Sequence, residues 1–95
     1  MGKLESFIHE TESFCTLKDA QKRYKFYKDA FRFFDKVLDF EYTNPQTNES
    51  TMRFTTQKGI LPKNEWTVAL FKPFEDKEEY EIHVSNIEFY PNEER

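Results

Sequence analysis

The chain has 95 residues, a formal net charge of −4 at neutral pH and an aromatic content of 18%, with eleven Phe, five Tyr and one Trp. This length is enough for one hydrophobic core, so we expect a single domain spanning residues 1–95. Two glycines in the whole sequence exclude a P-loop and a glycine-rich dinucleotide-binding loop, so we do not expect ATP- or NAD-dependent chemistry. A single cysteine excludes a disulfide framework and a multi-thiolate zinc site, and is typical of a reducing compartment.

Residues 1–36 are predicted to be helical, and they are basic. They carry eight Lys and Arg against six Asp and Glu, whereas residues 37–95 carry six against twelve. From residue 17 onward apolar residues recur at alternating spacings of three and four, which is the a/d spacing of a heptad and gives a helix one apolar face. We call this face the apolar seam, and it consists of Leu17, Ala20, Tyr24, Tyr27, Phe31, Phe34 and Leu38.

Two further helical faces follow from the same spacing. A second apolar set widens the apolar arc near the helix end, and consists of Phe26, Ala30, Phe33 and Val37. The face opposite the seam is basic, with Lys18, Lys22, Lys25, Arg32 and Lys36. The helix could begin at a cap formed by Thr11, Ser13 or Thr16. If Thr16 is the cap, residues 4–14 are expected to form a separate short helix.

After Asp35 the apolar period changes to two, which predicts that the helix ends near residues 35–37 and that strands follow. We expect strands over residues 38–43, 51–57, 66–71 and 80–85, the last extending toward residue 90. Residues 44–50 are predicted to be a hairpin loop and residues 75–79 a solvated turn. The predicted fold is α+β: one or two N-terminal helices pack on a four-stranded antiparallel meander over residues 37–90, followed by a tail over residues 91–95.

The candidates for nucleophilic or metal chemistry are His9, His83 and Cys15. Their spacing matches no metal site and no nucleophile–base pair, so we expect no cofactor, no metal and no enzymatic activity. The basic helix argues only weakly for nucleic acid, because its rings and its cations fall on opposite faces and the net charge is negative. No apolar run approaches the roughly 18 residues of a membrane span. We expect no membrane partner, and a location in the cytoplasm or nucleus.

A heptad-bearing helix followed by a strand meander resembles the RWD-type globular domains at the tips of coiled-coil kinetochore proteins. The resemblance covers about residues 17–90. Its best local piece is the first predicted hairpin, residues 38–44 followed by residues 52–56. This resemblance implies a structural adaptor that binds other proteins.

Two functional hypotheses result. In the first, the protein is a non-enzymatic protein–protein interaction module whose helix binds a partner, or a second copy of itself, through the seam residues Leu17, Tyr24, Tyr27, Phe31 and Phe34. In the alternative, it is a small acidic inhibitor of the phage or anti-defence type. The acidic edge would then block a basic site on a larger enzyme, through Glu75, Asp76, Glu78 and Glu79.

Overall fold

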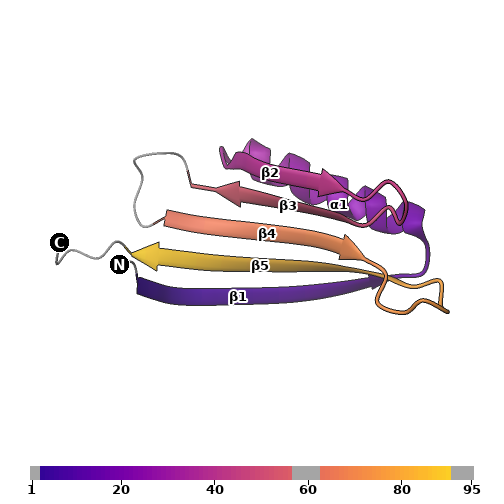
Figure 1. Cartoon of the computed structure of the whole chain (residues 1–95). Coiled ribbons are helices and arrows are strands. Elements are labelled where there is room, and N and C mark those ends of the chain that lie inside the picture. Colours follow the sequence, from indigo (N-terminus) through magenta and orange to yellow (C-terminus); the bar gives the residue numbers. More distant parts are fainter. Residues whose placement is uncertain (1–2, 57–62, 91–95) are drawn as a thin grey trace.

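The computed structural model describes residues 3–56 and 63–90. Within these segments the chain forms five β-strands and one α-helix: β1 Lys3–Phe14, α1 Leu17–Phe33, β2 Val37–Thr43, β3 Ser50–Thr55, β4 Lys63–Phe71 and β5 Tyr80–Tyr90. The strands make a single antiparallel sheet in the order β1-β5-β4-β3-β2. Figure 1 shows α1 running along one face of this sheet.

The order of β2 to β5 confirms the predicted meander. The prediction of a helix over residues 4–14 is wrong, because these residues belong to β1, which pairs with β5 from Lys3–Tyr90 to Phe14–Tyr80. The sheet therefore has five strands instead of four. Two physical reasons favour the strand: Glu10 interrupts the helical apolar pattern, and β1 satisfies backbone groups along an edge of β5 that would otherwise lack partners. The predicted tail, residues 91–95, lies outside the described residues.

Both ends of α1 have side-chain or backbone caps. Thr16 is the N-cap, and its Oγ1 accepts a hydrogen bond from the backbone N–H of Asp19 at 3.2 Å. Of the three alternative caps that the sequence offers, the structure thus uses Thr16. At the other end Asp35 adopts a left-handed conformation with φ of 63°. Its N–H donates to the carbonyl of Arg32, and the N–H of Lys36 donates to that of Phe31. This pattern is a Schellman motif with Asp where Gly is usual.

The core lies between α1 and the middle of the sheet. Its buried residues come from α1, β3, β4 and β5, and are Ala20, Tyr24, Met52, Phe54, Val68, Leu70, Tyr80 and Ile82. The molecule is elongated, with extents of 51 × 24 × 21 Å. The ends of β1, β4 and β5 continue past the C-terminal end of α1 (Figure 1), so part of the helix-bearing face is not covered by the helix. Of the described segments, α1 is the only helical one, and it does not have the length and hydrophobicity that a membrane crossing requires.

Candidate functional site

The apolar seam faces the sheet over most of its length. Tyr24 is buried, while Leu17, Tyr27 and Phe31 are half-buried and pack against the core. Only Phe34 of the predicted binding residues is largely exposed, at 64%. Phe34 therefore offers the largest exposed surface of these five residues, whereas Tyr24 offers almost none.

Two polar contacts hold α1 to both edges of the sheet. On the β1 side, Arg23 donates to both carboxylate oxygens of Glu12, at 3.0 and 2.9 Å, and the hydroxyl of Tyr27 donates to Glu12 Oε1 at 3.0 Å. The hydrogen bonds from Arg23 and Tyr27 lower the pKa of Glu12 against the opposing effect of burial. Burial, together with the Glu12 carboxylate, raises the pKa of Tyr27.

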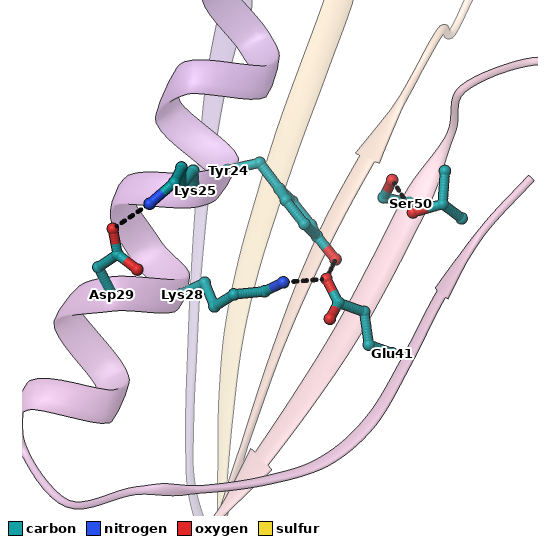
Figure 2. A network of polar contacts seen from close by, with 7 residues as sticks. Tyr24, Lys25, Lys28, Asp29, Glu41 and Ser50 are labelled. Atoms are coloured by element: carbon teal, nitrogen blue, oxygen red, sulfur yellow. Dashed lines mark hydrogen bonds and ion pairs between the residues drawn. The ribbon is translucent and has the colours of Figure 1, made fainter.

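On the β2 side, Tyr24 and Lys28 meet at one carboxylate oxygen of Glu41, as Figure 2 shows. The Tyr24 hydroxyl lies 3.3 Å and the Lys28 Nζ 2.8 Å from Glu41 Oε2. Burial, together with the Glu41 charge, raises the pKa of Tyr24. Because α1 contacts both edge strands, β1 and β2, its position on the sheet is well defined. The part of the sheet that α1 does not cover is therefore well defined too.

The predicted acidic edge lies in the connection between β4 and β5, near the start of α1 (Figure 1). Glu75, Asp76 and Glu78 are exposed and Glu79 is half-buried. Glu78 accepts a hydrogen bond from the Tyr80 hydroxyl at 2.8 Å, which raises the pKa of Tyr80. The same connection contains two lysines: Lys72 donates to the Glu75 carbonyl, and Lys77 lies over the Phe74 ring. These lysines reduce the net negative charge of the loop.

The candidates for nucleophilic chemistry are dispersed. His83 on β5 pairs with Glu81 at 3.0 Å and contacts the Phe71 ring, with 4.6 Å between ring centroids. Cys15 is an exposed free thiol in the turn between β1 and α1. The side chain of His9 lies outside the described part of the structure. Among the residues that the structure describes, no group of three or more His, Cys, Asp or Glu side chains is placed to hold a metal ion.

A groove opens where α1 ends and the strands continue. We call it the aromatic groove, and it has a volume of about 360 Å³. Its lining residues come from β1 (Glu10), α1 (Phe26, Tyr27, Ala30, Phe31, Phe34), β4 (Trp66) and β5 (Val84, Asn86). The helix supplies one wall and the strands supply the floor, because Val84 and Glu10 face each other across the β1–β5 pair, as do Asn86 and Trp66 across β4–β5.

Beside the groove lies an exposed aromatic surface, which consists of Phe26, Phe33 and Phe34. Their exposed fractions are 52%, 77% and 64%. Phe26 and Phe33 share one helical face at a spacing of seven residues, and the rings of Phe33 and Phe34 are 5.1 Å apart in an edge-to-face arrangement. These residues belong mainly to the second apolar set, whose spacing in the sequence already marked a separate face.

Four residues that line the groove are absent from the binding residues and apolar faces predicted from the sequence: Glu10, Trp66, Val84 and Asn86. Glu10 lies in the segment for which a short helix is predicted, and the other three lie on predicted strands, where alternation alone does not indicate a binding site. The one available signal was Glu10 itself, which breaks the heptad. Comparisons of the chain with protein-family models, with curated proteins and with solved structures found no match.

Proposed function

We propose that this protein is a non-enzymatic interaction module that binds a protein partner through the aromatic surface at the C-terminal end of α1. The observation that carries the proposal is the exposure of three phenylalanines in the C-terminal half of α1 and at its C-cap. Burying a Phe side chain fully stabilises a protein by about 1.5–3 kcal/mol, and this fold leaves half or more of the surface of Phe26, Phe33 and Phe34 exposed. Contiguous exposed apolar surface of this kind marks interaction sites, and aromatic side chains dominate binding energy at interfaces.

The proposal keeps the functional class that the sequence suggested and moves the binding surface around the helix. The seam residues Tyr24, Tyr27 and Phe31 pack in or against the core, whereas the exposed aromatic surface consists of Phe26 and Phe33 of the second apolar set and Phe34 of the seam. The polar contacts from Glu12 and Glu41 support this assignment, because they hold α1 with its seam against the sheet. The RWD-type resemblance and a kinetochore role stay predictions.

The test is selection of binding segments from a displayed library of random peptides on the purified protein. The variant Phe33→Ser/Phe34→Ser removes the most exposed rings without touching the buried core. The matched control, Lys18→Ser/Gln21→Ser, changes two exposed positions in the first half of α1. We expect enriched peptides to bind the wild type and the control with similar affinity, and to bind the Phe variant at least about tenfold more weakly, a loss of about 1.4 kcal/mol. Equal binding to all three proteins would refute the proposal.

Self-association through the same surface is a second form of the interaction. Light scattering on a sizing column across a concentration series measures it. A mass of two chains that falls to one chain in the Phe33→Ser/Phe34→Ser variant would identify the partner as a second copy. A dimer that the variant leaves intact would place self-association elsewhere.

A second candidate function is inhibition of a larger enzyme through the acidic edge. It is supported by the exposed carboxylates of Glu75, Asp76 and Glu78. The interleaved lysines weaken the field that such an inhibitor would need, so the aromatic surface supports the first proposal better. Replacing the four acidic residues of the edge with Ser should weaken inhibition of a basic target. Inhibition that is insensitive to salt would argue against this function.

A further inference from the structure

The aromatic groove has walls of connected rings. Ring centroids lie 5.7 Å apart between Phe26 and Tyr27, 6.4 Å between Tyr27 and Phe31, and 6.0 Å between Phe31 and Trp66. The face of an aromatic ring carries partial negative charge and attracts cations. A groove walled in this way is suited to an apolar stem that ends in a positive charge.

Neighbouring side chains already use these rings in that manner. The Arg23 guanidinium lies 4.7 Å from the centroid of Phe26, and the Lys36 ammonium lies 4.7 Å from that of Trp66. Neither cation is among the residues that line the groove. Both lie at its borders against rings of the lining, and the Arg23 charge is paired with Glu12.

Glu10 is the one charged residue that lines the groove. Two residues further along β1, Glu12 is neutralised by Arg23. Glu10 is exposed, and within the described residues it makes no ion pair or side-chain hydrogen bond. Its charge acts on the groove wall: burial and the contact with Glu12 raise the pKa of Tyr27, the Arg23 charge opposes this rise, and the Glu10 carboxylate adds to it as the smallest contribution. The groove thus combines several aromatic faces with one carboxylate that has no ion-pair partner among the described residues.

We propose that the aromatic groove binds the lysine or arginine side chain of a protein partner, with the apolar stem against Phe26, Phe31 and Trp66 and the cationic head at Glu10. This inference rests on the proposed function, because it names the chemistry by which the partner is recognised. The volume of about 360 Å³ lies at the lower end of the range for small-ligand sites. The charge complementarity selects a cation over a neutral or acidic side chain.

Trp66 is the only tryptophan in the chain and lines the groove, so its fluorescence and its indole N–H signal in NMR report on the groove directly. The probes are N-acetyl-lysine N-methylamide, the corresponding arginine compound, and the norleucine compound, which matches lysine in shape and lacks the charge. We expect the two cationic probes to change both Trp66 signals saturably and to bind at least about fivefold more tightly than norleucine.

Two variants make the test specific. Glu10→Gln removes the charge and keeps the shape, and it should reduce affinity for both cationic probes to that for norleucine. Glu75→Gln removes an exposed carboxylate from the β4–β5 connection and should change nothing. Equal binding of lysine and norleucine, unchanged binding in Glu10→Gln, or no response in either Trp66 signal would overturn the inference.

The selected peptides separate this inference from the proposed function. Peptides that require Phe33 and Phe34 but contain no enriched Lys or Arg, and that bind Glu10→Gln as well as the wild type, would leave the interaction surface in place and refute the cation site. Peptides that ignore Phe33 and Phe34 would refute the proposed function itself.

Discussion

Replacing Tyr24 with Phe removes one hydroxyl from the contact between α1 and β2. Tyr24 is 8% exposed, and its hydroxyl donates to Glu41 at 3.3 Å. A hydrogen bond of this kind contributes about 0.5–1.5 kcal/mol net. Glu41 keeps its ion pair with Lys28 and is partly open to water, so the carboxylate is not left unsatisfied. We therefore expect a loss of about 1 kcal/mol in the free energy of unfolding at neutral pH, or about 4–8 °C in Tm.

The effect of Tyr24→Phe on stability should also depend on pH in the alkaline range. The pKa of Tyr24 is raised in the folded state, so the proton is retained on folding at a pH where the unfolded chain, with an ordinary tyrosine pKa of about 10, has lost it. The protonated Tyr24 phenol therefore contributes fully to the free energy of unfolding of the wild type below about pH 10. This contribution decreases as pH rises further, by about 1.4 kcal/mol at about pH 11. The Phe variant has no such loss at this position, so the stability difference should close near about pH 11.

Urea unfolding followed by circular dichroism at neutral and alkaline pH measures both quantities. The slope of free energy against urea should be unchanged, because the two proteins expose similar surface on unfolding. A variant as stable as the wild type at neutral pH would show that the Tyr24–Glu41 contact contributes nothing. A stability difference that stays constant up to about pH 11 would refute the role assigned to burial of the phenol.

Three further predictions concern other parts of the fold. Asp35→Gly should stabilise the protein by about 0.5–1 kcal/mol in urea unfolding, because Gly adopts the left-handed conformation at no steric cost; destabilisation would contradict the Schellman assignment. Phe54→Ala should cost about 3–5 kcal/mol because the side chain is fully buried, whereas Phe33→Ala should change stability by less than about 0.5 kcal/mol; similar losses from the two would show that Phe33 is not free at the surface. The pKa of Glu12 is lowered in the folded state. Its ionised carboxylate therefore stabilises the fold above the ordinary carboxylate pKa, and this stabilisation is lost as pH falls through the folded pKa. For this partly exposed ion pair the stabilisation is at most about 1 kcal/mol. Glu12→Gln should therefore flatten the acid side of the stability profile, and an acid limb identical to that of the wild type would refute this role.

Local patterns in the sequence predicted α1 and the meander well. Thr16 was one of three candidate caps for the start of α1, and its hydroxyl accepts a hydrogen bond from a backbone N–H of the first turn. The strands follow from the alternation of apolar and polar residues around Phe54 and Val68. The end of the helix was harder to place, because Asp35 does the work that Gly normally does and leaves no compositional signal. The strand β1 was missed because its partner β5 is distant in sequence, and pairing between distant segments leaves little trace in local periodicity.

The site was predicted only in part for a related reason. A heptad pattern shows which helix face is apolar, but the same pattern serves a partner helix or a sheet, and here the sheet covers it. Of the three exposed rings, only Phe34 belongs to the heptad pattern, and Phe26 and Phe33 belong to the second apolar set. The groove needs Glu10 and Trp66 together, and that juxtaposition exists only once β1 and β5 are paired.

The pairing of β1 with β5 also sets the order in which the protein can fold. Lys3 pairs with Tyr90 and Phe14 with Tyr80, so β1 emerges from the ribosome long before the strand that it needs. The hairpins between β2 and β5 join neighbouring segments and can form early, whereas closure of β1 has a large entropic cost and comes late. Until β3, β4 and β5 have formed, the rings of α1 that later pack on the core lack the sheet beneath them, which makes the nascent chain a candidate for chaperone binding.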